Sequence, residues 1–160
     1  MAEIPVEMTT LEKPRIHHFR SDERLYYRFH FDHWEDGGVA AEAFRLPDMS
    51  VNRSLLGPPE WTILTEDDEY VLWGVTAFRV EDIPVGVEMP HRGVIIFTFR
   101  PEHVPLRKNY PHSEIWVFRE EDHICRKNKN LNLLDPEFHL RWRERLSQLA
   151  DVIIQPTEEE

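Results

Sequence analysis

The chain has 160 residues and a mass of 19.2 kDa, a length typical of one domain that can bury a substantial core without a metal or disulfides. Hydrophobic residues make up 41% of the chain and aromatic residues 11%, which is too much core material for a disordered protein. The formal net charge is −11 at pH 7 with histidine neutral. Such a charge repels phosphate backbones, so we expect no broad binding to nucleic acids.

The sequence also predicts a compartment. Cys125 is the single cysteine, so no disulfide can form within the chain, as is typical of a reducing environment. No apolar run reaches the roughly 18 residues of a membrane span, and residues 1–5 show no secretory signal. We therefore expect a cytoplasmic protein without a membrane partner.

In chain order, residues 1–20 lack any period of 2 or 3.6 and predict an irregular arm. Residues 24–31 follow, and their alternation places Leu25, Tyr27, Phe29 and Phe31 on one side of a strand. Residues 35–38 predict a turn because they contain Asp-Gly-Gly. Residues 39–44 are a returning strand or a short helix, and we favour the strand.

Prolines bound the next segment, residues 47–62, and predict a loop held by its own polar contacts. An acidic turn at 66–69 leads into residues 70–80, the best candidate for a central strand. Residues 94–99 predict a buried strand that Pro101 and Pro105 close. A second irregular polar segment, 107–113, precedes a strand over 114–119.

A C-terminal amphipathic helix is expected over residues 135–154. Asp135 and Pro136 form a start signal, with Asp as N-cap and Pro at the first helical position. Apolar residues then recur at helical spacing, and we expect Phe138, Trp142, Leu146 and Leu149 to face the sheet. Residues 156–160 predict a solvated acidic tail. The pattern favours a single α+β domain in which about five or six mostly antiparallel strands pack against one helix.

Strong catalytic motifs are missing from the sequence. It contains no phosphate-binding Gly-rich loop, no Gly-x-Ser-x-Gly and no His-Glu-x-x-His, and none of its histidine pairs has the spacing of a structural zinc site. We therefore predict no cofactor and no metal site.

The two proline-bounded polar segments, 48–53 and 109–114, are the candidate site, because loops on a rigid sheet often carry function. If they meet, they combine a cation, hydroxyl and amide donors, an imidazole and a carboxylate, which suits an anionic group beside a proton donor or acceptor. The candidate catalytic residues are His112 and Glu114, and the candidate ligand-binding residues are Arg28, Ser50, Asn52, Arg53, Asn109 and Ser113. A structural alternative stays open, in which these side chains form turns or satisfy backbone groups.

Three elements occur in order: Asp48-Met49-Ser50-Val51-Asn52-Arg53, then Gly74-Val75-Thr76-Ala77-Phe78, then Asn109-Tyr110-Pro111-His112-Ser113-Glu114. Over residues 24–119 this order resembles a group of small uncharacterised bacterial proteins with no established activity. The resemblance implies a bacterial protein of this group and carries no function over. The C-terminal helix and the acidic tail depart from it.

Two functions follow as expectations. The first is a pocket for a small anionic or phosphate-bearing ligand, compatible with a nucleotide-modifying or metal-independent phosphodiester enzyme, with Arg28 and Arg53 as anchors and His112 as general acid or base. The second is a non-catalytic interaction module of a multi-component bacterial system, which would bind a basic protein partner through exposed Trp34 and Trp61. The residues leave catalysis and binding open.

Overall fold

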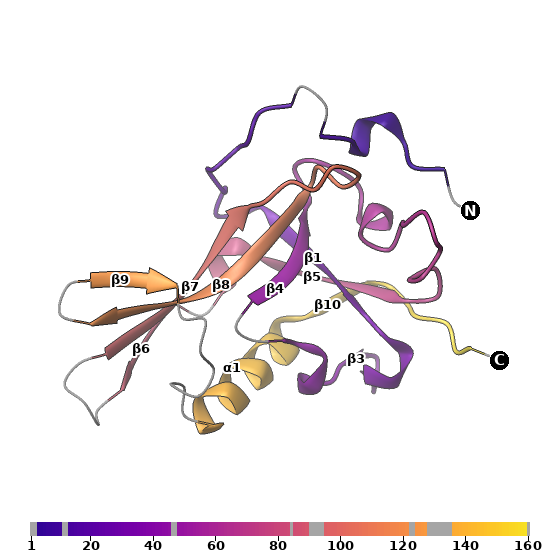
Figure 1. Cartoon of the computed structure of the whole chain (residues 1–160). Coiled ribbons are helices and arrows are strands. Elements are labelled where there is room, and N and C mark those ends of the chain that lie inside the picture. The colour runs from indigo at the N-terminus through magenta and orange to yellow at the C-terminus, as the bar shows by residue number, and fades with distance from the viewer. Residues whose placement is uncertain are drawn as a thin grey trace.

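Antiparallel pairing connects every strand of the main sheet in the computed structural model, which describes residues 3–10, 13–45, 48–83, 85–89, 95–121, 124–127 and 136–159. The strand order within these residues is β10-β5-β1-β4-β8-β7-β6, and β9 pairs with β8 (Figure 1). The strands are β1 (Arg24–Phe29), β4 (Asp48–Arg53), β5 (Gly74–Arg79), β6 (Val85–Met89), β7 (Ile95–His103), β8 (His112–Glu121), β9 (Ile124–Lys127) and β10 (Asp151–Ile154). The predicted α+β class is confirmed, with an eight-stranded sheet among the described residues.

The main core lies between one face of the sheet and the helix α1 (Pro136–Leu149) (Figure 1). Trp142 and Leu146 of α1 are buried there as predicted, and the Trp142 ring stacks on Phe99 with centroids 4.0 Å apart. Leu25, Tyr27 and Phe29 of β1 face this core as predicted, but the strand ends at Phe29, and Phe31 lies in the 3-10 turn η2 (Phe31–His33) instead. Val94, the Asp135 cap and the Phe138 side chain fall outside the described residues.

A small hairpin and a 3-10 turn cover the end of this core. Strands β2 (Trp34–Glu35) and β3 (Gly38–Val39) form the hairpin, and η3 (Ala41–Ala43) follows. The predicted turn is confirmed, because Asp36 and Gly37 adopt φ values of 50° and 79°, the left-handed region that a tight hairpin turn requires. Residues 39–44 thus contain the end of a returning strand at Val39 and then the short 3-10 helix η3, so the favoured strand over the whole segment is wrong and the short-helix alternative describes residues 41–43.

The predicted loop at 48–53 is wrong, because these residues form the central strand β4. Met49 and Val51 alternate with Asp48 and Ser50, which is the period of a strand, and both apolar side chains are buried. Pro58 and Pro59 lie beyond the paired residues of β4 and remove none of its ladder hydrogen bonds, and Pro47 is outside the described residues.

Other predicted boundaries also move. Strand β8 begins at His112 rather than at Glu114 and continues to Glu121. Strand β7 continues through Pro101 to His103. Because β6 pairs with β7 only as far as Thr98, no strand among the described residues lies beside Pro101 on that side and needs its missing N–H. The helix ends at Leu149 rather than at 154, and the β-branched run Val152-Ile153-Ile154 forms β10 beside β5.

The segment predicted as a strand from Tyr70 begins pairing only at Gly74. Residues 55–73 instead form a long connection with a 3-10 turn, η4 (Pro59–Thr62), on the sheet face opposite α1. Tyr70 and Trp73 pack edge to face, with ring centroids 4.8 Å apart. This connection, called the 55–73 loop below, covers the face of the sheet opposite α1, which is called the polar face below.

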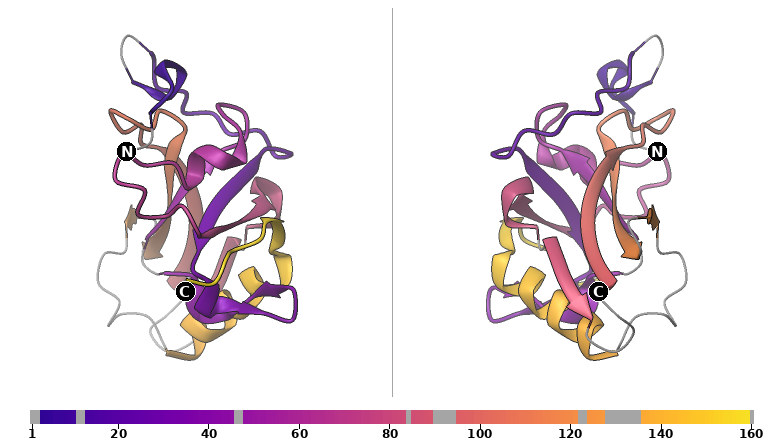
Figure 2. Two further views of the ribbon diagram at one scale, coloured as in Figure 1. Left: turned by 90° about the vertical axis from the view of Figure 1, so that its right-hand side faces the viewer. Right: turned by 90° about the vertical axis from the view of Figure 1, so that its left-hand side faces the viewer.

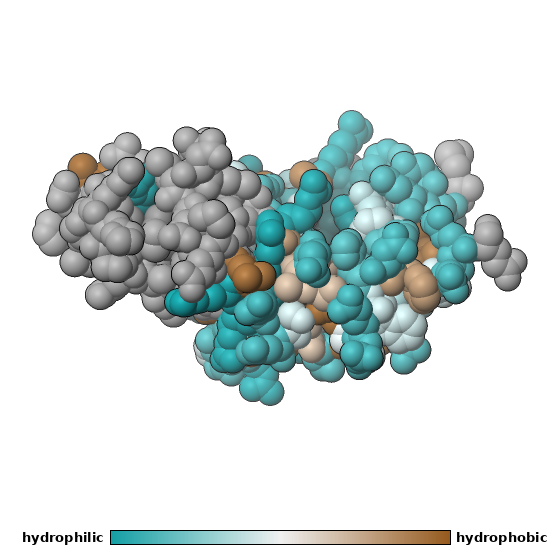
Figure 3. Space-filling view, turned by 90° about the horizontal axis from the view of Figure 1, so that it is seen from below, coloured by the Kyte–Doolittle hydropathy of each residue, from teal (hydrophilic) through white to brown (hydrophobic). Residues whose placement is uncertain are grey.

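The N-terminal arm and α1 lie at opposite ends of the molecule (Figure 2). The described arm contains one 3-10 turn, η1 (Val6–Met8), and no strand, in line with the irregular arm that the sequence predicts. Figure 3 shows the molecule from the side of α1, where hydrophilic side chains cover most of the described surface. Within the described residues, no helix has both the length and the apolar character to cross a membrane.

Candidate functional site

The register between β4 and β8 gathers polar side chains on one face of the sheet. Ser50 lies opposite Glu114, and Asn52 lies opposite His112. Side chains alternate along a strand, so these four share the face that points away from Met49 and Val51. Arg28 projects to the same face from β1, because its neighbours Tyr27 and Phe29 point into the core. The two polar segments therefore meet, as predicted, through strand pairing rather than as loops.

Arg28 is the half-buried cation of this face. Its guanidinium lies over the Tyr70 ring, with Cζ 3.6 Å from the ring centroid, a cation–π contact that also holds the plane of the group. Nη1 donates a long hydrogen bond of 3.3 Å to the Thr62 carbonyl. Among the described residues, the remaining guanidinium N–H groups have no hydrogen-bond acceptor, so Arg28 can donate to a ligand.

His112 is held in one tautomer. Its Nδ1 lies 2.7 Å from the Val104 carbonyl oxygen; a carbonyl can only accept, so Nδ1 carries the proton and Nε2 presents a lone pair. The side chain is 7% exposed. Burial lowers the pKa of His112 from its ordinary value, and Arg28 adds to this, while the Val104 carbonyl and the Glu114 carboxylate oppose it. Burial therefore favours the neutral form of the imidazole, whose Nε2 can accept a hydrogen bond.

Two carboxylates, Glu114 and Asp48, lie on the same face of the sheet as His112. Glu114 accepts a hydrogen bond of 2.7 Å from Trp116 Nε1. Partial burial raises the pKa of Asp48, and the negative charge of Glu114 raises it further. Asp48 was not predicted as a site residue, because the loop interpretation of 48–53 gave no reason to place it beside Ser50 and Glu114.

Asn52 and Asn109 face each other rather than a ligand. Asn52 Nδ2 donates to Asn109 Oδ1 at 3.0 Å, and Asn109 Nδ2 donates to Asn52 Oδ1 at 2.7 Å. Asn52 is buried and Asn109 half-buried. The pair joins β4 to the tight turn that precedes β8, so its visible role is to position His112. This matches the structural alternative that the sequence left open.

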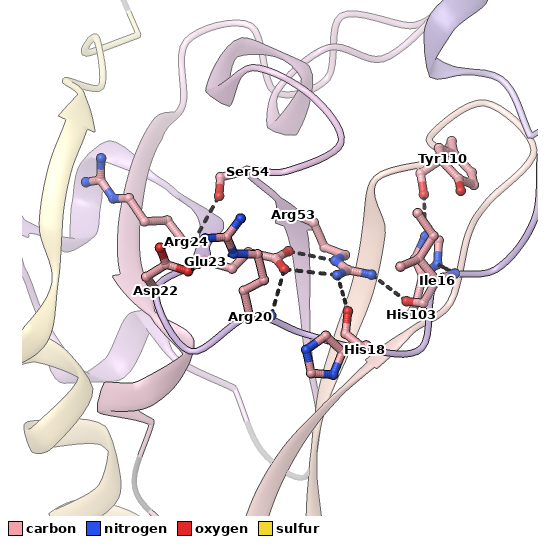
Figure 4. A network of polar contacts seen from close by, with 10 residues as sticks. All are labelled: Ile16, His18, Arg20, Asp22, Glu23, Arg24, Arg53, Ser54, His103 and Tyr110. Carbon is pink, nitrogen blue, oxygen red and sulfur yellow. Dashed lines mark hydrogen bonds and ion pairs between the residues drawn. The ribbon is translucent and has the colours of Figure 1, made fainter.

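Arg53 does not fit the predicted role of anion anchor. Its side chain is fully buried, and Glu23 accepts from Nε and Nη2 at 2.6 and 2.9 Å (Figure 4). The same guanidinium donates to the carbonyls of Ile16 and His18 and lies over the Phe19 ring. Its donors are therefore engaged by the protein, and Arg53 fastens the N-terminal arm to β4.

Ser113 also lies away from the polar face. It pairs with Val51, whose side chain is in the core, and it is fully buried on that side. Its odd position in β8 places it with Ile115 and Val117. Ser113 is thus separated from His112 and Glu114 by the sheet itself.

Two cavities meet at Arg28, Ser50 and Tyr70. The larger has a volume of about 590 Å³ and is also lined by residues of β1, β4 and η3 and by Trp73. The smaller, about 450 Å³, lies under the 55–73 loop and is also lined by His112, Asn109, Trp61 and Thr62. Both volumes fall within the range of small-molecule sites, about 300–1,000 Å³.

Sequence reasoning missed the aromatic lining of these cavities. Tyr70 and Trp73 were assigned to a strand, although the acidic turn at 66–69 and the prolines before it already indicated a long connection. In the described parts of the chain, no three His, Cys, Asp or Glu side chains are placed to hold a metal ion.

Comparisons with protein-family models, with curated proteins and with solved structures give no match for this chain. The resemblance to small bacterial proteins stays a prediction, and the functional argument depends on the geometry of the site.

Proposed function

We propose that the protein binds a small organic anion, a carboxylate or a phosphate ester, on the polar face of the sheet, with Arg28 as the anchor. The observation that carries the proposal is the contrast between two arginines of adjacent strands. Arg53 is fully buried and bonded to a carboxylate and two carbonyls. Arg28 keeps one long hydrogen bond and lies where two cavities meet.

The guanidinium of Arg28, rather than the charge of its surroundings, favours an anionic ligand. Lys108 borders the same cavity but is paired with Glu66. The exposed carboxylates of the 55–73 loop would repel an anion, but solvent and salt screen charges that lie at the surface. The planar guanidinium of Arg28 instead offers directed, bidentate hydrogen bonds at short range. The charge of the whole chain therefore opposes long polyanions more than a small ligand.

His112 gives the proposed site a chemical function beyond binding. The His112 side chain lies on the same face of the sheet as Arg28 and lines the smaller cavity, and burial favours the neutral imidazole. A group of this kind can accept a hydrogen bond from a ligand hydroxyl or act as a general base. A nucleotide-modifying or phosphodiester reaction with His112 as the general base and Glu114 as a second catalytic residue is the catalytic form of the proposal.

The interaction-module alternative receives less support. Trp34 and Trp61, its proposed anchors, are half-buried rather than exposed. Trp34 packs against the core, and Trp61 lies so close to Gly57 that a Cβ added there would clash with the indole ring. Their aromatic surface is therefore already in use within the chain.

Thermal unfolding in the presence of inorganic phosphate and of acetate, at constant ionic strength, tests the anion site. A ligand that binds only the folded state adds RT ln(1 + L/Kd), where L is the free ligand concentration, to the free energy of unfolding and so raises the melting temperature. We expect a rise for wild type and none for Arg28→Gln. Arg79→Gln is the matched control, since Arg79 is exposed and paired with Glu81. A wild type without response, or Arg28→Gln with a full response, would overturn the proposal.

A further inference from the structure

The larger cavity lies within the plane of the sheet. Its lining includes Tyr27 and Phe29, which face the core, and Arg28 and His30, which face the other side. Strand β4 likewise contributes residues of both faces. A cavity that contacts both faces of two neighbouring strands must lie between them, so β1 and β4 are separated there.

The pairing between these strands shows where the separation begins. The ladder contains Leu25↔Arg53 and Tyr26↔Asn52 and goes no further, although β1 continues to Phe29 and β4 starts at Asp48. Figure 1 shows β1 and β4 together at one end and apart at the other. If the register continued, Arg28 would lie opposite Ser50.

The main-chain groups of Arg28 and Ser50 point into this opening. Ser54 N–H donates to the Arg24 carbonyl across the same two strands, at 2.9 Å. In an antiparallel pair the hydrogen-bonded positions recur every second residue. The residues of β1 whose main-chain N–H and C=O point toward β4 are therefore 24, 26 and 28. On their outer sides β1 is paired with β5 and β4 with β8. The opening therefore has two facing strand edges whose ladder is interrupted.

The walls of the opening suit an extended main chain. Tyr70 and Trp73 of the 55–73 loop border it on the polar side, and Ala43 of η3 borders it on the core side. Its charged lining is balanced, with Arg28 and Arg45 against Glu42 and Asp48. The inward-facing main-chain donors and acceptors of Arg28 and Ser50 can pair with another main chain by strand addition, whereas a compact anion would use the Arg28 side chain alone.

We propose that the ligand is a short extended peptide with a free C-terminal carboxylate, whose main chain fills the opening between β1 and β4 and whose carboxylate binds Arg28. Because β1 and β4 are antiparallel, the inserted peptide is parallel to one and antiparallel to the other. The inference rests on the proposed function, since it uses the same anchor. It adds the class of the ligand.

The experiment uses the full-length chain and a randomised pool of N-acetylated tetrapeptides made in three forms. One form ends in a carboxylate, one in a carboxamide, and one ends in a carboxylate but carries N-methyl groups on its amides. Retained peptides are measured by ultrafiltration and mass spectrometry. We expect the first form to be enriched about tenfold over each of the others, and Arg28→Gln to lose the enrichment while Arg79→Gln keeps it.

The phosphate and acetate titration, run beside the peptide pool, separates the two proposals. If those anions act through Arg28 and no peptide is enriched, the peptide inference is overturned and the anion site stands. Equal retention of carboxylate and carboxamide forms would overturn the role of the carboxylate. Equal retention of N-methylated peptides would overturn the main-chain pairing. If neither peptides nor anions respond to Arg28→Gln, both proposals fail.

Discussion

Asn52 and Asn109 are joined by two side-chain hydrogen bonds that run in opposite directions, 3.0 and 2.7 Å long. Each amide uses its oxygen and its nitrogen on the other, so the pair fixes both side-chain orientations. Asn109 belongs to the turn before β8, where Leu106 and Asn109 pair, and His112 N–H donates to the Asn109 carbonyl at 3.1 Å. The pair therefore connects β4 to the segment that presents the imidazole.

Replacing Asn109 by Asp tests this connection. One carboxylate oxygen would face Asn52 Oδ1, so a hydrogen bond becomes a repulsion, and we expect a loss of about 1–3 kcal/mol in the free energy of unfolding. Urea denaturation measures it. Gln148→Glu on the exposed side of α1 adds the same charge and should change stability by less than about 0.5 kcal/mol. Equal effects of the two variants would contradict the pairing.

The Arg53–Glu23 pair makes a second prediction. Both side chains are inaccessible to solvent, so Arg53→Met leaves a buried carboxylate without its counter-ion, and we expect a loss of about 3–5 kcal/mol. Arg24→Met removes an exposed pair with Asp151 and should cost no more than about 1 kcal/mol. An Arg53→Met variant that melts with wild type would show that Arg53 is not a structural residue.

Trp142 connects α1 to the sheet. The ring is buried and stacks on Phe99 at an interplanar angle of 9°, so Trp142→Ala should cost about 3–5 kcal/mol by leaving a cavity. Trp142→Phe should cost clearly less, because it keeps an aromatic ring and deletes an indole N–H that has no partner within the described residues. Calorimetric melts of both variants measure this. Equal losses for Ala and Phe would contradict the stacking argument.

His103 predicts how stability changes with pH. Its Nδ1 accepts from the Ile16 N–H at 2.9 Å, and its Nε2 donates to the Tyr110 carbonyl at 2.9 Å, an arrangement that only the neutral ring can make. Burial lowers the pKa of His103, the nearby Arg53 and His17 lower it further, and the Tyr110 carbonyl opposes this. His103 therefore binds a proton more readily in the unfolded chain, where its pKa is near the ordinary value of about 6.5.

The contribution of His103 to the free energy of unfolding is complete above about pH 6.5. It is lost as the pH falls from there toward the lowered pKa of His103 in the folded state. We expect the free energy of unfolding to fall from pH 7.5 to pH 5.5 more steeply in wild type than in His103→Gln, whose amide can accept and donate without titrating. Denaturant melts at several pH values give both slopes. Parallel slopes would show that His103 does not titrate on unfolding in this range.

Local patterns predicted the parts of the fold that depend on neighbouring residues. The alternation of Leu25, Tyr27 and Phe29 gave β1, and the spacing of Trp142 and Leu146 gave the buried face of α1. The same period of two would have separated Ser113 from His112 if 112–113 had been interpreted as strand. Treating the segment as a loop removed that information, because a loop has no defined faces.

Other features had no local signal. The burial of Arg53 depends on Glu23 and on the carbonyls of Ile16 and His18, which lie about thirty or more positions away in the chain. The separation of β1 from β4 depends on where a long-range register stops. These are properties of tertiary pairing, and nearest-neighbour patterns do not contain them.

The position of β10 has a consequence for folding. β5 lies between β1 and β10, and its partner on the β10 side comes after α1, near the end of the printed sequence. Until β10 docks, one edge of β5 is unpaired and exposes residues such as Val75 and Ala77, which are buried in the folded protein. An unpaired strand edge is a template for pairing with another chain. We therefore expect light scattering during refolding to rise with protein concentration, and a refolding yield independent of concentration would argue against an open β5 edge. Any change that slows the folding of α1 also prolongs the time during which two molecules can exchange β10.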